Sequence, residues 1–287
     1  MIKRRSWKRC KMAKTYVEVL SGASSFLEAN GKEGYAIEYL FLARKNWDKT
    51  QWLMNMRNDI LPDDEAMIEK DIESLMKNIP PQYLLGYEYF FEYRLKVTED
   101  TLIPRPETEE LVALCLSMTE SKRKKVVDIG TGTGAIAISL KLARPDWQVT
   151  ALDISQEALR VAKENAENLH AKINFKRSDV LSSMIEKQDI IISNPPYISQ
   201  NEWALMDESV RTYEPKLALF AENDGLAIYQ KIAAESRDLL QPAGMIFLEI
   251  GFQQGRAVQE IFQKAFPEKN VRVHQDLSGN DRMVVIS

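Results

Sequence analysis

The strongest constraint on the fold is a pattern that begins at Lys125, in which short apolar runs alternate with stretches of helical periodicity. Short apolar runs between helices are typical of buried strands. Strands that alternate with helices build a mainly parallel sheet with helices on both faces, so we expect an α/β domain here. The expected strands are Val126–Ile129, Val149–Leu152, Ile173–Phe175, Ile190–Ile192, Met245–Ile250, Val271–Val273 and Met283–Ile286. The expected helices are Ala135–Leu142, Gln156–Leu169, Leu226–Leu240 and Arg256–Phe266.

The last two of these seven expected strands are joined by a short turn from Asp276 to Asp281. Parallel neighbours need a crossover connection, and a helix does not fit into a turn of this length. We therefore expect a seven-stranded sheet whose last strand is antiparallel.

Residues 15 to about 80 carry a different pattern, with apolar residues such as Ile37 and Leu40 at three- and four-residue steps. Four or five short helices, packed as a small bundle, are expected there. The aromatic stretch Tyr83–Val97 favours a hairpin or an extended linker. The predicted organisation is a helical domain over 1–82, a hairpin or linker over 83–100, and the α/β domain over 101–287, with a further helix from Glu107 to Leu116.

The charge of the chain bears on its partners. The net charge is −4 and the pI about 5.5, whereas proteins that work mainly on nucleic acid usually carry a basic excess. No direct nucleic-acid partner is therefore expected. The exception is local, since residues 1–14 contain seven basic side chains. We expect a solvated tail whose first 11 residues are dispensable, and the alternative is a contact to RNA or to an acidic partner.

Two cysteines and two histidines are present, and they do not have the spacing of metal ligands. No metal is therefore expected, and the low cysteine content suits a reducing cytosol. No stretch approaches the ~20 apolar residues that a membrane span needs. No apolar run of signal-peptide length follows the basic N-terminus, so we expect a cytoplasmic protein without a membrane partner.

A glycine-rich segment, VVDIGTGTGAIAISL, joins the first expected strand to the first expected helix. Gly130, Gly132 and Gly134 alternate with Thr131 and Thr133, and glycine lets the backbone turn sharply while a ligand approaches it closely. The spacing is neither the G-x-G-x-x-G of dinucleotide enzymes nor a phosphate-binding P-loop. This segment therefore predicts a cofactor site without a phosphate cradle.

Acidic residues end the next strands. Asp153 can accept hydrogen bonds from both hydroxyls of a ribose, although it also precedes a helix that it can cap. Asp179 can reach an adenine amino group while Val180 packs on the base, and the alternative for Asp179 is a turn residue. Asp128 can support the cofactor or the loop. Adenosine binding without a phosphate site favours S-adenosyl-L-methionine over NAD.

Asn194-Pro195-Pro196-Tyr197 directly follows the fourth expected strand. Ligands of an open α/β sheet bind outside the carboxyl ends of the strands, so this segment is expected beside the glycine loop. The side-chain oxygen of Asn194 and the carbonyl of Pro195 can accept the two N–H groups of a planar amide or amino nitrogen. The prolines hold that carbonyl rigidly, and Tyr197 offers a flat wall. This pattern predicts methyl transfer to nitrogen, in which alignment supplies much of the rate.

At this point the sequence resembles the HemK/PrmC family, the protein-(glutamine-N5) methyltransferases of release factors. The resemblance covers nearly the whole chain from about residue 15, and the segment IPRPETE makes it specific. After YLLG the family tends to keep a glycine near an aromatic pair, and here Phe90-Phe91 is followed by Glu92. The matching stretches are PPQYLLG (80–86), TLIPRPETEELV (101–112), VVDIGTGTGAIAISL (126–140), ALDIS (151–155), SNPPYI (193–198), YEPKLALFAENDGL (213–226), LEIGFQQG (248–255) and GNDRMVV (279–285).

The resemblance implies a class I, Rossmann-like methyltransferase domain behind a small helical domain. It implies methylation of the glutamine in the Gly-Gly-Gln motif of class I peptide chain release factors, which act in translation termination. The implied donor contacts are Gly130 to Gly134, Asp153, Val180 and Asn194, to which the strand-end argument above adds Asp179. The implied substrate contacts are Asn194 to Tyr197, with Arg105 and Glu107 over the site; the alternative for the last two is a helix-entry turn.

Four other functions remain open at the level of sequence. A sibling enzyme that methylates a glutamine of a ribosomal protein would share the core motifs. An adenine-N6 methyltransferase of nucleic acid would also use Asn-Pro-Pro-Tyr, but it must flip its base and usually carries a basic binding region. A non-catalytic scaffold that binds the donor would not need Asn194. An NAD-dependent oxidoreductase would leave Asn-Pro-Pro-Tyr without a function.

Overall fold

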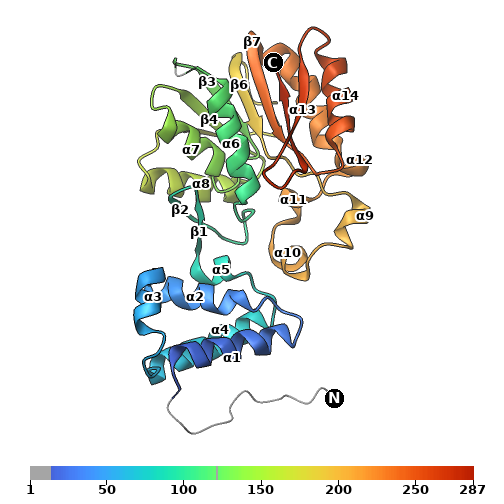
Figure 1. Cartoon of the computed structure of the whole chain (residues 1–287). Coiled ribbons are helices and arrows are strands. Elements are labelled where there is room, and N and C mark those ends of the chain that lie inside the picture. Colours follow the sequence, from blue (N-terminus) through green and yellow to red (C-terminus); the bar gives the residue numbers. More distant parts are fainter. Residues whose placement is uncertain (1–13, 121) are drawn as a thin grey trace. The chain divides into compact units, whose positions relative to one another are not determined.

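The computed structural model describes residues 14–120 and 122–287, and the predicted dispensable tail lies outside these residues. The described chain forms two compact units (Figure 1). The first unit contains the chain up to Gly86 together with Glu208–Tyr213. The second unit contains Tyr87–Asp207 and Glu214–Ser287.

The first unit is helical, as its periodicity predicts. Its core is formed by apolar side chains from three of its helices, such as Leu27, Ile37 and Ile68. The buried carboxylate of Asp64 accepts a hydrogen bond of 2.6 Å from the hydroxyl of Tyr16. The helices are α1 (Tyr16–Glu28), α2 (Tyr35–Lys45), α3 (Lys49–Asn55), α4 (Pro62–Leu75), α5 (Pro81–Leu85) and α10 (Glu208–Tyr213). None of the helices in the described part of the chain is long and apolar enough to cross a membrane.

The second unit is built on a seven-stranded sheet with the strand order β5-β4-β3-β6-β7-β9-β8. The strands are β3 (Lys125–Ile129), β4 (Gln148–Asp153), β5 (Asn174–Arg177), β6 (Gln188–Ser193), β7 (Leu240–Glu249), β8 (Val271–Gln275) and β9 (Asp281–Ile286). Neighbours from β5 to β7 pair in parallel, whereas β9 pairs antiparallel with both β7 and β8. The prediction of an antiparallel last strand is therefore confirmed.

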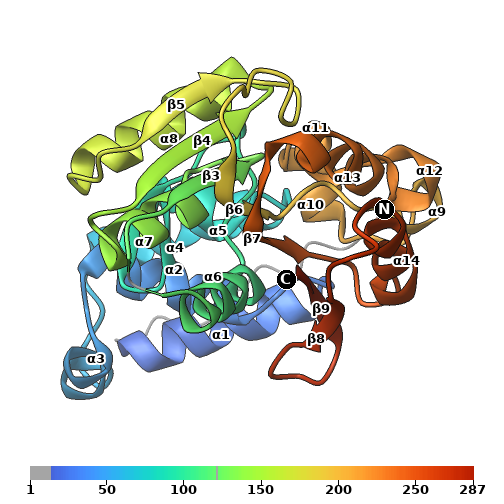
Figure 2. The same cartoon turned by 90° about the horizontal axis from the view of Figure 1, so that it is seen from above.

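Helices cover both faces of this sheet because its strands are apolar on both sides (Figure 2). Side chains that alternate along a strand point to opposite faces. Val126 therefore packs in one core with α6 (Pro106–Met118), α7 (Ala135–Ala143) and α8 (Gln156–Asn168), and Val127 packs in the other with α13 (Ala227–Leu239) and α14 (Gly255–Ala265).

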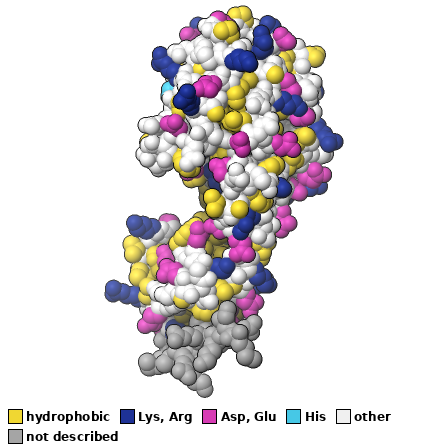
Figure 3. All heavy atoms as spheres, turned by 90° about the vertical axis from the view of Figure 1, so that its right-hand side faces the viewer, with side chains coloured by type: hydrophobic (Ala, Val, Ile, Leu, Met, Phe, Trp, Pro, Cys, Tyr) yellow, Lys and Arg dark blue, Asp and Glu magenta, His cyan; other side chains and the backbone are white. Residues whose placement is uncertain are grey.

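Charged side chains of both signs are interspersed over the face of the second unit that Figure 3 draws. On the drawn face of this unit the basic side chains do not form a continuous stripe. The picture agrees with the modest net charge of −4.

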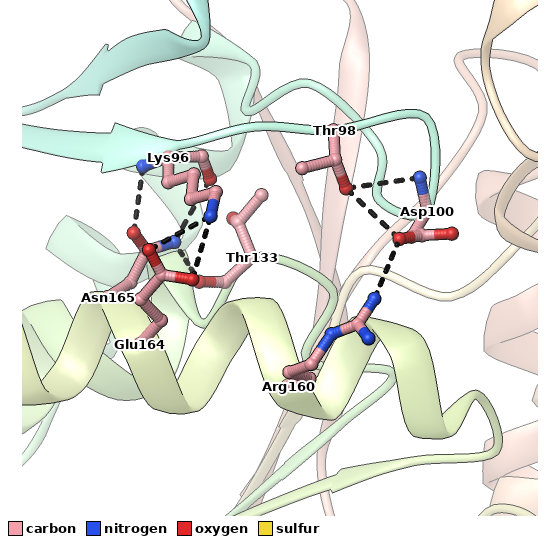
Figure 4. Close-up of polar contacts among 7 residues, drawn as sticks. All are labelled: Lys96, Thr98, Asp100, Thr133, Arg160, Glu164 and Asn165. Atoms are coloured by element: carbon pink, nitrogen blue, oxygen red, sulfur yellow. Dashed lines mark hydrogen bonds and ion pairs between the residues drawn. The ribbon is translucent and has the colours of Figure 1, made fainter.

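A hairpin of β1 (Tyr87–Phe90) and β2 (Tyr93–Lys96) is tied to the glycine loop through α8 (Figure 4). The buried amide of Asn165 accepts a bond of 2.7 Å from the backbone N–H of Lys96, and donates to the carbonyls of Lys96 and Thr133. Arg160 reaches Asp100 further along the same segment. Residues 96–100 are thereby held against the loop that follows β3.

The structure corrects the expected elements in three places. Tyr83–Leu85 belongs to helix α5 and not to the hairpin or linker, and Leu240 begins β7 and does not end a helix. Four short helices between Ser199 and Gly225 were not expected: α9 (Gln200–Trp203), α10, α11 (Lys216–Leu219) and α12 (Glu222–Gly225). In the turn between β1 and β2, directly before Glu92, Phe91 adopts a φ of 51°, a conformation that glycine reaches without strain.

Candidate functional site

A pocket of about 440 Å³ opens at the carboxyl ends of the parallel strands. It is lined by residues that follow β3, β4, β5 and β6, where an open α/β sheet binds its ligands. Among its described lining residues the charged ones are all acidic: Glu99, Asp100, Asp153, Glu157 and Asp179. Such a pocket suits a ligand that carries positive charge, and it opposes the phosphates of a dinucleotide.

The glycine loop forms one wall of this pocket. Gly130 and Gly132 line it and have φ angles of 70° and 54°, in the left-handed region that favours glycine. A Cβ atom added at either position would enter open space, so the loop leaves room for a ligand close to its backbone. Gly134 has a different task, since a Cβ there would lie 3.2 Å from the Cβ of Ala162 on α8.

The two threonines of the loop do not line the pocket. Thr131 and Thr133 are buried, and the hydroxyl of Thr131 donates a bond of 2.6 Å to Asp128. Burial raises the pKa of the Asp128 carboxyl to about 7, against the opposing effect of the Thr131 hydrogen bond. Thr133 offers its carbonyl to Asn165. The side chains of Thr131, Asp128 and Asn165 therefore fix the shape of the loop.

Asp153, the last residue of β4, lies where a ribose can reach it. One carboxylate oxygen accepts from the backbone N–H of Gly132 and the other from that of Ser155, each at 2.9 Å. Burial raises the pKa of Asp153, and these amide hydrogen bonds oppose the shift. The cap of α8 is Ser155, whose hydroxyl accepts from the N–H of Ala158. Each oxygen of Asp153 thus has one fixed donor and further acceptor capacity for a ligand.

Asp179 and Val180, which follow β5, also line the pocket. Val180 is buried and has a φ of 54°, which is uncommon for a β-branched residue and is typical of a functional site. Asp179 lies at the rim, with its side chain 55% exposed, and forms an ion pair of 2.5 Å with Lys231. An adenine amino group at this carboxylate would therefore share it with a lysine.

Asn194 lies at the end of β6 and lines the pocket together with Pro195 and Pro196. Its side-chain N–H donates a bond of 3.0 Å to the hydroxyl of Thr108. That hydroxyl in turn donates a bond of 2.6 Å to the buried carboxylate of Glu249. Burial raises the pKa of Glu249 to about 7, while Thr108 and the nearby Arg282 lower it. Among the described residues, no donor reaches the side-chain oxygen of Asn194 within hydrogen-bond distance.

Tyr197 is not among the residues that line the pocket, and its backbone is held by Gln254 and Gly225. Removal from water, together with the charge of Glu249, raises its pKa to about 12, so the phenol stays neutral. The side-chain amide of Gln254 donates a bond of 3.0 Å to the carbonyl of Tyr197 and accepts from the N–H of Gly251. Gly225 packs so closely that an added Cβ would lie 2.1 Å from the same carbonyl.

Arg105 and Glu107 stand at the start of α6 and do not line the pocket. The guanidinium of Arg105 forms an ion pair of 2.5 Å with Glu214, which is buried and also accepts from the N–H of Ile103. Arg105 therefore joins the segment before α6 to Glu214, the residue directly before Pro215, which lines the pocket. The charge of Glu107 acts on both Tyr197 and Glu249 and raises the pKa of each.

The sequence interpretation missed residues that support Asn194 and Tyr197. Thr108, Glu249 and Gln254 lie within stretches that carry the family resemblance, but no role was assigned to them. The residue type of Glu249 was a usable signal, since a glutamate at the end of a buried apolar run needs a hydrogen-bond partner. The sequence could not identify Thr108 as that partner, because the two residues are 141 positions apart.

Comparisons with known proteins show which family this chain resembles. Residues 18–86 match the family model of the PrmC N-terminal domain, and residues 109–217 match that of the methyltransferase small domain. A release factor glutamine methyltransferase of Enterococcus faecalis is 57% identical over 275 residues, which cover 96% of this chain and 99% of that protein. A protein of the same name from Lactococcus lactis subsp. lactis is 49% identical over 260 residues, which cover 91% of this chain and 96% of that protein.

Among solved structures, a methyltransferase from Pyrococcus furiosus superposes with a TM-score of 0.54 and 17% identity, covering 76% of this chain and 97% of that one. At this low identity the likeness establishes the fold alone. The sheet order and the antiparallel last strand give the class I, Rossmann-like methyltransferase fold.

Proposed function

This chain belongs to the family of release factor glutamine methyltransferases, and from that premise we propose that it methylates the side-chain amide nitrogen of the glutamine in the Gly-Gly-Gln motif of class I release factors. The methyl donor is S-adenosyl-L-methionine, which supplies an electrophilic methyl group on a sulfonium ion when it is bound. The acidic lining of the pocket and the open space at Gly130 and Gly132 fit this donor.

The donor site is proposed to lie along the walls of the pocket. Asp153 accepts from the ribose hydroxyls, the loop Gly130–Gly134 lies against the methionine part, and Val180 packs on the adenine. Asp179 accepts from the adenine amino group and shares its charge with Lys231. Thr131, Thr133 and Gly134 contribute through the shape of the loop.

The orientation of Asn194 is the observation that carries the proposal. An amide nitrogen is a poor nucleophile because its lone pair is delocalised, so the enzyme must orient it. Thr108 takes the N–H side of Asn194. The oxygen of Asn194 is therefore available to accept one N–H of the substrate, and the carbonyl of Pro195 can accept the other. Pro196 keeps that carbonyl rigid, and Tyr197 supplies a neutral, flat wall.

Alignment of this kind can supply about 7–11 kcal/mol of the barrier, so a strong base is not required. Arg105 and Glu107 act beside the substrate through Glu214, Tyr197 and Glu249, with which they interact. We assign recognition of the release factor to the helical unit up to Gly86, and methyl transfer to the second unit. A protein that modifies a translation factor is proposed to work in the cytoplasm.

Transfer of a labelled methyl group from the donor to a purified release factor tests this function. The parallel samples are a release factor whose Gly-Gly-Gln glutamine is replaced, a ribosomal protein fraction, and a duplex DNA. Label on the intact factor alone supports the proposal. Label on the ribosomal fraction or on the DNA, with none on the factor, contradicts it and points to the sibling glutamine enzyme or to the adenine methyltransferase.

Replacement of Asn194 tests the assigned chemistry. Asn194→Ala is expected to lower kcat by about a hundredfold, because the amide nitrogen loses an acceptor that is placed for the transition state. The dissociation constant of the donor should change by less than about threefold. The exposed Asn168→Ala on α8 serves as the matched control. Full turnover of Asn194→Ala in a single-turnover experiment would remove Asn194 from the mechanism.

A further inference from the structure

We infer that Thr108 and Glu249 are positioning residues that set which end of the Asn194 amide faces the substrate. The inference rests on the proposed function, since it explains how the acceptor oxygen of Asn194 is presented to the substrate nitrogen. It adds two residues to the catalytic arrangement, neither of which touches the substrate.

The three side chains come from separate elements and meet beside the pocket. Thr108 lies in the first turn of α6, Glu249 ends β7, and Asn194 follows β6. Thr108 and Glu249 are 5% and 2% exposed, so water does not compete freely for their hydrogen bonds. The bond from Thr108 to Glu249 is 2.6 Å long, and that from Asn194 to Thr108 is 3.0 Å. A short bond to a carboxylate is typical of the stronger, charge-assisted class.

The direction of these bonds follows from the chemistry of the groups. An ionised carboxylate only accepts, and a threonine hydroxyl has a single proton to give. Because the Thr108 hydroxyl donates its one hydrogen bond to Glu249, its oxygen can only accept a hydrogen bond from Asn194. The amide must then turn its N–H side toward Thr108 and its oxygen away from it. An isolated asparagine lacks this restriction, since its two ends have nearly the same shape.

Protonation of Glu249 would remove the restriction. A carboxylic acid can donate to Thr108, and the hydroxyl can then donate to the oxygen of Asn194. The amide would present its N–H side to the N–H groups of the substrate, so donor would face donor. Ionised Glu249 therefore corresponds to the productive orientation, and methyl transfer should slow as the pH falls through the range in which Glu249 takes up a proton.

The groups around Glu249 place this range near neutral pH. Burial raises its pKa to about 7, and Glu107 adds to the rise. Thr108, Arg282 on β9 and Arg105 oppose it. The phenol of Tyr197 faces the same carboxylate, and Tyr229 on α13 donates to the backbone carbonyl of Glu249 at 2.8 Å. Both tyrosines have raised pKa values, so they remain neutral in this range.

Substitutions at Thr108 separate orientation from packing. Thr108→Val keeps the shape but removes the hydroxyl, and we expect kcat to fall by about tenfold to a hundredfold. Thr108→Ser keeps the hydroxyl and should retain kcat within about threefold. The donor dissociation constant should change little in both variants. Thr150→Val on β4, a half-buried threonine of the same sheet, is the matched control for the loss of a hydroxyl.

The pH dependence of kcat provides a readout that a packing role would not move. The wild type should lose rate between about pH 8 and pH 6, and Glu249→Gln, which cannot ionise, should lack this acid limb. Asp128 also has a pKa of about 7 and remains in this variant, so an acid limb that came from Asp128 would persist unchanged. An acid limb with the midpoint and amplitude of the wild type in Glu249→Gln would therefore assign the limb to another group and overturn the role of Glu249.

The outcomes also separate this inference from the proposed function. Wild-type turnover on the release factor, loss of turnover in Asn194→Ala, and full turnover in Thr108→Val would overturn the inference and leave the function intact. Absence of turnover in the wild type would overturn the function first. If Thr108→Val does not fold, the pH profile of Glu249→Gln decides the question, since glutamine keeps the volume of the native glutamate side chain.

Discussion

At the scale of single residues, this site works with carboxylates placed in partly or fully buried positions. Asp128, Asp153 and Glu249 all have raised pKa values because burial disfavours their charged forms. Each accepts hydrogen bonds from the loop or helix beside it. For Asp128 and Glu249, whose pKa values are raised to about 7, this means that they stabilise the fold less as the pH rises from about 4 to 7. The site therefore keeps acceptors in place at a cost in stability near neutral pH.

Asp153 gives the clearest residue-scale prediction. Asp153→Ala is expected to weaken donor binding by about tenfold to a hundredfold, because it removes the acceptor for the ribose and releases the N–H of Gly132. Isothermal titration calorimetry measures the dissociation constant directly. Asp238→Ala, an exposed aspartate on α13, is the control. A dissociation constant equal to that of the wild type would refute the ribose assignment.

At the scale of elements, the segment after β6 depends on support from α12 and from the start of α14. Asn223 and Asp224 in α12 both adopt left-handed conformations, and Gly225 follows them with a φ of 80°. This bend brings the Cα atom of Gly225 close to the backbone carbonyl of Tyr197. The side-chain amide of Gln254 donates to the carbonyls of both Tyr197 and Asp224. The Asn-Pro-Pro-Tyr segment is thus shaped by residues that follow it by up to 57 positions.

Gly225→Ala tests this support. The added methyl group would lie 2.1 Å from the carbonyl oxygen of Tyr197, so the backbone must move. We expect kcat to fall by about tenfold or more, since a small misplacement near the reacting atoms is costly. Gly279→Ala is a matched control, because Gly279 has a φ of 82° and open space around it. Equal activity in the two variants would contradict this role, because the contact to Tyr197 would then cost no more than the same backbone strain at Gly279.

The elements that the sequence predicted are those with a clear apolar pattern. The helices were found from their three- and four-residue period, and the seven strands from the short apolar runs between them. The helices α9, α11 and α12 were not found, since they have four residues each and owe their form to tertiary contacts. One such contact is the pairing of Ile198 with Phe220. Asn194 and Asp153 could be proposed from residue type and strand end, whereas Thr108 and Glu249 required the fold.

At the scale of the whole molecule, the two units divide the proposed work. All lining residues of the donor pocket belong to the second unit. The first unit matches the PrmC N-terminal domain and holds α10 through bonds from Asn78 to Glu208 and from Tyr213 to Lys77. In the segment that follows Asn-Pro-Pro-Tyr, residues Glu208–Tyr213 belong to the first unit, and the second unit resumes at Glu214. The unit to which we assign recognition and the unit to which we assign methyl transfer are therefore connected through the chain itself.

The basic tail allows a prediction at this scale. The pocket lining runs from Glu99 to Ile228, so deletion of residues 1–11 removes none of it. We expect the shortened protein to keep the donor affinity and the kcat of the full chain within about twofold. Measurements at low and high salt distinguish a charge contact from a fold effect. A large, salt-dependent loss of activity on the release factor would assign the tail to partner binding.

The most direct test of the central claim is fragment mass spectrometry of a release factor after incubation with the enzyme and the donor. The account predicts a gain of one methyl group on the glutamine side chain of the Gly-Gly-Gln motif, with no such gain when Asn194→Ala replaces the enzyme. A methyl group at any other residue, or none with the wild type, would contradict the account.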